Sequence, residues 1–340
     1  MLWQDREVRF DVSRRDLLFK QGEKVFKSLE SVEDVKGNNG DRGTLYITNL
    51  RLLWISKGLK LNSLSIGFSC FTSTYLKNVN SKAIGKTSAV VILTKFSGIR
   101  YEFIFAQGEI DNSKILNYVA TIYRSYDSTR IYRDLRLRGA VMKGNSLILL
   151  PVEQLFDEIE GVWNLSSDQG NLGKLFVTNI RIVWVSIMNE NFNISIPFLQ
   201  IQIVATRNSK FGEALVVQTS RQAGSYLLGF RIDPQERLMK TLKQLSTLHD
   251  LYMKNPVLGV EVTLETELQV ESISEQTDEF RDQIVEDNCD ILSTYLADAT
   301  KLTDREPVYN EDLGLAVERL PENYSIFDLW KLTPQRKKEK

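Results

Sequence analysis

The strongest constraint on the fold of this chain is an internal repeat with an offset of 130 residues. Residues 40–56 read Gly-Asp-Arg-Gly-Thr-Leu-Tyr-Ile-Thr-Asn-Leu-Arg-Leu-Leu-Trp-Ile-Ser, and residues 170–186 read Gly-Asn-Leu-Gly-Lys-Leu-Phe-Val-Thr-Asn-Ile-Arg-Ile-Val-Trp-Val-Ser. The same offset aligns residues 64–68 with residues 194–198. Two copies at such a long period indicate two duplicated domains and not a solenoid of short units.

The length of 340 residues accommodates two domains and a C-terminal tail. We expect a first domain over residues 1–130, a second over residues 131–255 and a tail over residues 256–340. Apolar residues make up 42% of the chain, which is enough for two hydrophobic cores. Only Cys70 and Cys289 are present, so we expect no disulfide framework and a reducing compartment such as the cytoplasm.

Each copy has the pattern of a small antiparallel β domain followed by one helix. Residues 45–48 and 51–56 read as two strands joined by a turn at Thr48-Asn49, because asparagine tolerates the backbone of tight turns. Further strands are predicted around residues 25–35, 64–68, 71–76, 89–93 and 101–105. An apolar stripe at helical spacing then follows in each copy: Ile115, Val119, Ile122 and Tyr126, and Leu238, Leu242, Leu245, Leu248 and Tyr252.

These elements predict a mainly β fold of two tandem pleckstrin-homology-like, seven-stranded barrels. Each barrel is closed by a C-terminal α-helix, and the tail is expected to be acidic and partly helical. Asp233, Pro234 and Glu236 form a capping-box pattern at the start of the second helix. The repeated tryptophans, Trp54 and Trp184, are expected in the cores. The repeated glycines are expected to serve backbone turns before a strand: Gly40, Gly43, Gly170 and Gly173.

The near-neutral net charge of −1 conceals a strong asymmetry along the chain. Residues 1–255 carry 34 basic and 24 acidic side chains, whereas residues 256–340 carry 9 basic and 20 acidic ones. A mildly basic body of this kind can meet an acidic partner or an anionic lipid surface, or its charge can be solvated without any partner. Because basic and acidic residues nearly balance overall, we do not expect a nucleic-acid partner.

The chain resembles the Bardet-Biedl syndrome 5 protein family over almost its whole length. The glycine–strand–Thr-Asn-x-Arg–strand–Trp pattern is similar to that of the GRAM subgroup of pleckstrin-homology-like domains. The family resemblance is carried by residues 34–43, 161–171, 192–197, 305–308 and 312–316.

The resemblance implies a non-enzymatic subunit of the BBSome, a coat that carries membrane proteins into and out of cilia. It implies other BBSome subunits (β-propeller and TPR proteins) as partners, together with phosphoinositide-containing membranes. An Arf-like small GTPase and ciliary membrane cargo are implied as indirect partners. The implied locations are the cytoplasm, the cilium, the basal body and, peripherally, the ciliary membrane. No cofactor and no metal are expected.

Basic residues provide the candidates for lipid binding, although solubility alone also explains them. Arg51 and Arg181 form a repeated polar pair, for which we consider either a phosphate contact or a structural salt bridge. The remaining candidates are assigned to two loops of the first domain: Lys57 and Lys60, and Lys77, Lys82 and Lys86. A weaker basic cluster, which an acidic partner or the tail could contact, surrounds the interdomain linker: Arg130, Arg133, Arg136 and Arg138.

Catalysis is not supported by the residues present. GRAM domains accompany lipid phosphatases that need a Cys-x5-Arg loop, but Leu76 and Tyr295 stand six residues after the two cysteines. The only histidine, His249, falls near the end of a predicted helix and has no plausible catalytic partners. The alternative functions that remain are purely protein-scaffolding barrels and the regulatory domains of a lipid-metabolising enzyme.

The tail combines an acidic stretch with a compact apolar group. Residues 261–290 are acidic and expected to be flexible, and order is expected to return near Pro307. A short amphipathic helix followed by aromatic residues should bury its apolar side chains against a partner protein or against one of the chain's own barrels. The docking candidates lie within about residues 305–332: Leu313, Val317, Leu320, Tyr324, Phe327 and Trp330.

Overall fold

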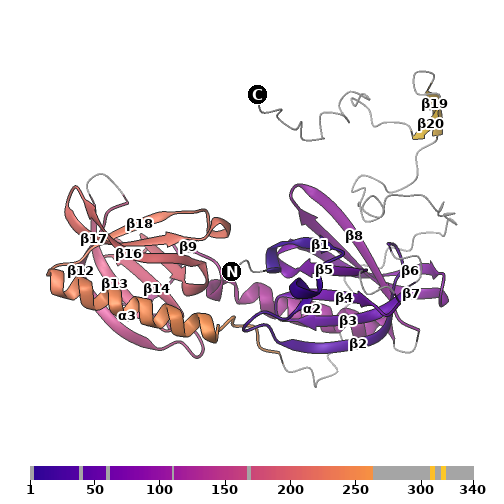
Figure 1. The fold of residues 1–340 in the computed structure, drawn as a ribbon, viewed down its shortest axis with the longest axis horizontal. Coiled ribbons are helices and arrows are strands. Elements are labelled where there is room, and N and C mark those ends of the chain that lie inside the picture. The colour runs from indigo at the N-terminus through magenta and orange to yellow at the C-terminus, as the bar shows by residue number, and fades with distance from the viewer. Residues whose placement is uncertain are drawn as a thin grey trace. The chain divides into compact units, whose positions relative to one another are not determined.

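The computed structural model describes residues 4–37, 41–58, 62–108, 111–166, 170–262, 307–310 and 315–318. It contains two β domains, each followed by a long helix, and a separate hairpin in the tail (Figure 1). We call the part from β1 to α2 domain 1 and the part from β9 to α3 domain 2. This architecture confirms the prediction of a mainly β chain with two tandem pleckstrin-homology-like domains.

In its described residues, domain 1 has eight strands and two α-helices. They are β1 (Val8–Phe10), α1 (Arg14–Leu17), β2 (Val25–Asp34), β3 (Arg42–Thr48), β4 (Arg51–Ser56), β5 (Ser63–Gly67), β6 (Phe71–Ser81), β7 (Gly85–Phe96), β8 (Ile99–Ala106) and α2 (Asn112–Ser128). The strands form one antiparallel sheet in the order β1-β5-β4-β3-β2-β8-β7-β6. The helix α2 packs against β3, β6 and β7.

Domain 2 repeats this arrangement. Its elements are β9 (Arg136–Leu137), β10 (Met142–Lys143), β11 (Ser146–Leu147), β12 (Leu155–Asn164), β13 (Asn171–Thr178), β14 (Arg181–Ser186), β15 (Asn193–Pro197), β16 (Ile201–Ser209), β17 (Gly212–Thr219), β18 (Leu227–Arg231) and α3 (Gln235–Lys254). The main sheet has the order β16-β17-β18-β12-β13-β14-β15-β9, and β10 pairs with β11. The helix α3 packs against β16 and β17.

Each main sheet has eight strands, one more than the sequence predicted. The additional strands are β1, which pairs with β5, and β9, which pairs with β15. They have only three and two residues, too few to show a period-2 pattern. By pairing with β5 and β15, they protect backbone groups that would otherwise lie at a sheet edge.

The repeated tryptophans anchor the two cores, as predicted. Trp54 and Trp184 are 0% and 1% exposed, and their indole N–H groups donate to the carbonyl oxygens of Val32 and Val162. Gly43 and Gly173 do not serve turns, which corrects the expectation: they lie within β3 and β13. A Cβ at either glycine would lie 2.6 Å or less from the neighbouring indole ring. The glycines therefore allow close contact between a strand and a tryptophan.

The helix starts differ from each other although the domains are duplicated. Asp111 caps α2 by accepting a hydrogen bond from the Ser113 N–H at 3.0 Å. In domain 2 the expected capping box is absent, because Pro234 is the N-cap residue and makes no side-chain cap. The carboxylate of Asp233 instead forms an ion pair with Arg231 at 3.0 Å. The capping-box prediction was therefore wrong.

The linker arginines do not form one accessible basic cluster. Arg133 is 1% exposed, lies over the Tyr126 ring at 4.0 Å, and donates to the Leu258 carbonyl oxygen at 2.6 Å. Arg130 is paired with Asp127 at 2.5 Å. Arg136 and Arg138 are exposed. Arg133 thus connects the end of α2 to the segment that follows α3, so it is not available to an acidic partner.

Beyond residue 262, the described residues of the tail form a β-hairpin and not a helix. It pairs β19 (Pro307–Asn310) with β20 (Leu315–Glu318), and Val317 stands opposite Val308. The prediction of a short helix through Val317 was therefore wrong at this residue. The other docking candidates lie outside the described residues: Leu313, Leu320, Tyr324, Phe327 and Trp330.

Candidate functional site

Arg51 and Arg181 occupy equivalent buried positions at the start of β4 and β14. Both side chains are fully buried, and each Nε donates to a buried glutamate at 2.8 Å: Arg51 to Glu23 and Arg181 to Glu153. The glutamates are themselves related by the repeat offset. Because a buried charge must be paired to be tolerated, each ion pair is a structural unit of its domain.

The Thr-Asn pair of each repeat completes this polar cluster. Thr48 and Thr178 donate to the glutamates at 3.0 and 2.9 Å. Asn49 accepts from the Lys24 N–H at 3.0 Å, and Asn179 accepts from the Gln154 N–H at 2.7 Å. The motif therefore ties the turn between two strands to the segment that precedes the first long strand of the domain.

This geometry decides between the two alternatives considered for Arg51 and Arg181, a phosphate contact and a structural salt bridge. Strand alternation places each arginine on the face of its strand opposite tryptophan. In the structure, the segment before β2 covers that face, and Arg51 donates to the Asp16 and Leu18 carbonyl oxygens at 3.3 Å. Arg181 likewise donates to the Ile148 carbonyl oxygen at 2.8 Å. Neither guanidinium group is exposed, so the salt-bridge alternative applies.

Three of the other cationic candidates lie at one end of domain 1. Lys57 follows β4, Lys82 lies in the turn between β6 and β7, and Lys86 is the second residue of β7. All three side chains are exposed. Lys57 forms an ion pair with Glu30 at 2.9 Å. Because both side chains of this pair are largely exposed, the pair contributes little to stability and Lys57 can exchange its partner. Lys60 lies outside the described residues.

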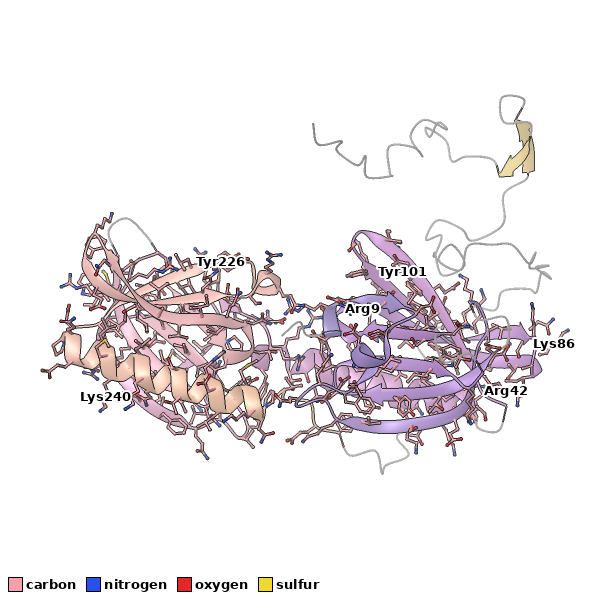
Figure 2. The ribbon with its side chains drawn as sticks, viewed as in Figure 1. Arg9, Arg42, Lys86, Tyr101, Tyr226 and Lys240 are labelled. Atoms are coloured by element: carbon pink, nitrogen blue, oxygen red, sulfur yellow. The ribbon has the colours of Figure 1, made fainter. Side chains whose placement is uncertain are left out.

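Arg42 joins these two basic segments, although the sequence reasoning did not select it. Its carbonyl oxygen accepts the Lys57 N–H at 2.9 Å, and its guanidinium donates to the Ala83 carbonyl oxygen at 3.4 Å. Figure 2 shows Arg42 and Lys86 at the same end of domain 1. We call Arg42, Lys57, Lys82 and Lys86 the basic end of domain 1. The signal that could have found Arg42 is its replacement by Leu172 in the second copy.

Lys77 does not belong to this end. It lies inside strand β6, opposite Ala89, and not in a loop. It precedes Lys82 by five residues, which corresponds to about 17 Å along a strand. The expectation of one loop containing Lys77, Lys82 and Lys86 is corrected accordingly.

The equivalent end of domain 2 keeps only part of this charge, because Arg207 of β16 and Lys210 of the following turn remain. Ile187 stands at the position of Lys57, and Glu190 at the position of Lys60. Ile187 and Met188 are 56% and 94% exposed. The nearby Lys174 is paired with Glu158 and Glu160, at 3.2 and 2.7 Å. The two copies therefore present chemically different surfaces at corresponding ends.

The cysteine and the histidine considered as catalytic candidates have structural surroundings. Cys70 is buried, and this burial raises the pKa of its thiol to about 12, so the reactive thiolate is disfavoured. The His249 ring lies 3.2 Å from the Ile201 carbonyl oxygen and packs edge-on against Phe198. Within the described ranges, no group of three or more histidine, cysteine and acidic side chains could hold a metal ion. None of the helices in the described part of the chain has the length and apolar character needed to cross a membrane.

Comparison with known proteins identifies the family. Residues 23–128 match the family model described as the Bardet-Biedl syndrome 5 protein N-terminal PH-like domain, and residues 136–262 match that of the second PH-like domain. The chain is 45% identical to "BBSome complex member BBS5" of Danio rerio, with 97% of each chain covered. It is 44% identical to the Homo sapiens protein of the same name, over 97% of this chain and 98% of that protein.

A more distant relative shows the same coverage. "BBSome complex member bbs-5" of Caenorhabditis elegans is 36% identical, over 97% of each chain. Both PH-like domains and nearly the whole length of the chain are thus matched. The chain therefore belongs to the Bardet-Biedl syndrome 5 protein family.

Proposed function

We propose that this chain is a non-enzymatic BBSome subunit that takes part in the trafficking of ciliary membrane proteins. Its relatives of nearly equal length are named as BBSome complex members, which supports other BBSome subunits as its partners. The proposal includes β-propeller and TPR subunits as direct partners, and an Arf-like GTPase and membrane cargo as indirect ones. The corresponding locations are the cytoplasm, the cilium, its basal body and its membrane.

We further propose that the basic end of domain 1 binds phosphoinositide headgroups. The observation that carries this proposal is the divergence of the two copies: Arg42 and Lys57 of domain 1 correspond to Leu172 and Ile187 of domain 2. Lysines and arginines near an anionic membrane each contribute about 1 kcal/mol to binding. A cluster of four therefore provides a useful membrane affinity, and the equivalent end of domain 2 carries fewer cations, because only Arg207 and Lys210 remain there.

Assembly is tested by expressing the tagged full chain in ciliated cells that lack their own copy of this subunit. We expect the other BBSome subunits to co-purify with it and to co-elute as one large complex. Elution of the chain as a free monomer from these cells, with the remaining subunits assembled without it, would contradict the proposal.

Lipid binding is tested by flotation of the full chain with vesicles that contain single phosphoinositides. Neutralising the basic residues of domain 1 should weaken binding at least 100-fold, because each cation contributes about 1 kcal/mol. The variant replaces six residues with glutamine: Arg42, Lys57, Lys60, Lys77, Lys82 and Lys86. Binding by the unchanged chain should also decrease as salt is raised.

The matched control removes six positive charges from domain 2. It replaces Lys143, Arg207, Lys210, Arg237, Lys240 and Lys243 with glutamine. We expect less than a fivefold loss of vesicle binding in this control. Equal losses in both variants would show that only net charge matters, and absence of binding by the unchanged chain would leave protein scaffolding as the function.

One observation favours the scaffolding alternative for domain 2. Ile187 and Met188 are exposed on the loop between β14 and β15. Two hydrogen bonds hold this loop. The Asn193 side chain donates to the Glu190 carbonyl oxygen, and the Asn191 N–H donates to Asn189 Oδ1. A fixed loop that exposes apolar side chains suits a protein contact better than a headgroup contact. We therefore assign partner binding to domain 2 as the second candidate function.

A further inference from the structure

Domain 2 has an open groove between the start of β12 and the outer side of α3, with a volume of about 580 Å³. Its apolar part includes Phe156 and Leu251, which are 51% and 57% exposed. We call it the β12–α3 groove. It is lined by Phe156, Asp157, Lys240, Lys243, Gln244, Thr247, Leu248 and Leu251.

The two long helices can be aligned through their buried stripes, and the alignment explains how this groove arises. Val119, Ile122 and Tyr126 of α2 have the same spacing as Leu245, Leu248 and Tyr252 of α3. Tyr118 therefore corresponds to Gln244. In domain 1 the Nζ of Lys27 lies over the Tyr118 ring at 4.9 Å. Domain 2 has the smaller Gln244 and Asp157 at these two positions, which leaves a hollow between strand and helix.

The same alignment shows how domain 1 covers the end of its helix. Ser125 of α2 corresponds to Leu251 of α3, and its hydroxyl donates to the Glu261 carbonyl oxygen at 3.1 Å. Glu261 belongs to residues 256–262, which we call the strap. Leu258 and Val260 of the strap are 4% and 5% exposed, so alternate apolar side chains point into the protein. An extended segment with alternating apolar residues thus contacts α2 at the position where Leu251 stands exposed on α3.

The polar groups of the β12–α3 groove indicate the chemistry of its occupant. Lys240 and Lys243 are exposed on α3, and within the described residues neither forms an ion pair; Lys240 is marked in Figure 2. Asp157 is the acidic side chain of the lining. The Gln244 Oε1 atom is buried and, among the described residues, has no hydrogen-bond donor. A buried acceptor of this kind is stabilised when a ligand supplies an N–H group.

We propose that the β12–α3 groove binds an extended acidic peptide segment of a partner protein. In this segment apolar residues alternate along the chain, as they do in the strap. One apolar side chain of the segment fills the hollow beside Gln244 and packs on Phe156 and Leu251. A backbone N–H of the segment donates to Gln244 Oε1. Carboxylates on either side of the apolar residue pair with Lys240 and Lys243. This inference does not depend on BBSome membership, because it concerns a surface of the isolated chain.

The test uses a fluorescein-labelled peptide with the sequence of residues 256–267, Pro-Val-Leu-Gly-Val-Glu-Val-Thr-Leu-Glu-Thr-Glu. In the full chain the strap already occupies its own site on domain 1, so the free peptide reports on the open groove. Fluorescence anisotropy should give a dissociation constant of about 10–100 µM, because a short segment loses conformational entropy on binding. The K240E/K243E double variant should weaken binding at least fivefold.

Two controls make the result specific. Met239 is 49% exposed on the same helix but does not line the groove, so M239E should leave the affinity unchanged. A peptide in which the three glutamates are replaced by lysine should bind at least tenfold more weakly. Equal affinity for both peptides, or equal affinity of K240E/K243E and the unchanged chain, would overturn the proposal. Self-association of the full chain that is lost in K240E/K243E would also overturn it, by assigning the groove to a second copy.

Discussion

Replacing Glu153 with leucine is expected to lower the free energy of unfolding of domain 2 by about 3–5 kcal/mol. Arg181 would then lie fully buried without its carboxylate partner, which it now contacts through Nε at 2.8 Å and through Nη2 at 3.0 Å. Thr178 would also lose its carboxylate acceptor, which leaves the Arg181 carbonyl oxygen at 2.9 Å as the acceptor for its hydroxyl. Chemical denaturation of a full chain in which Trp3, Trp54 and Trp330 are replaced with phenylalanine, followed by tryptophan fluorescence, measures the change, because Trp163 and Trp184 of domain 2 are then its only tryptophans.

The double variant E153L/R181M separates charge burial from packing. Because it removes both charges together, it should recover most of the stability that E153L loses. The control is E160L, since Glu160 pairs with Lys174 at the surface and its side chain is 70% exposed. Exposed pairs of this kind contribute little to stability, so E160L should be far less destabilising than E153L. If E153L were no more destabilising than E160L, the buried pair of Glu153 and Arg181 would not be required for the stability of domain 2.

Replacing Gly173 with alanine is expected to destabilise domain 2 by about 2–3 kcal/mol, in the upper part of the usual range for overpacking. A Cβ at this position would lie 2.5 Å from Trp184 Cε2 and closer still to the Val185 carbonyl oxygen. Both neighbours belong to β14, which pairs directly with β13, so neither can move without disturbing the sheet. The midpoint of urea unfolding reports the loss.

Gly229 provides the matched control for this substitution. It lies in β18 of the same sheet, and a Cβ there would make ordinary contacts with Leu165 at 3.6 Å or more. G229A should therefore change the free energy of unfolding by less than about 1 kcal/mol. If G173A and G229A unfolded at the same urea concentration, the close contact between β13 and Trp184 would not be what requires glycine.

The duplicated fold could be predicted because its signals are local or periodic. The repeat places Trp54 and Trp184 at equivalent positions, and the helical stripes through Ile122 and Leu248 give the buried side of each helix. The choice between a phosphate contact and a salt bridge for Arg51 stayed open because strand alternation says nothing about what covers the outer face of a sheet. The partner Glu23 lies 28 residues upstream, and only its equivalence with Glu153 could have revealed the pair.

Other features depended on tertiary contacts that residue spacing does not encode. Asp233 has the sequence context of a helix cap, yet its carboxylate is held by Arg231. The sequence around Lys77 has the composition of a basic loop, but Lys77 lies inside the hairpin of β6 and β7. The β12–α3 groove results from the difference between Tyr118 and Gln244, whose significance appears only when the two helices are aligned in space.

The central claim is that domain 1, and not the equivalent end of domain 2, meets the membrane. The repeat supplies a matched pair of labelling sites, because Gly58 and Met188 are equivalent and both are exposed. A cysteine at either position, in a C289S background with Cys70 buried, can carry an environment-sensitive dye. On addition of phosphoinositide vesicles to the full chain, we predict a blue shift of the dye at residue 58 and none at residue 188. A shift at residue 188 without one at residue 58 would contradict this account.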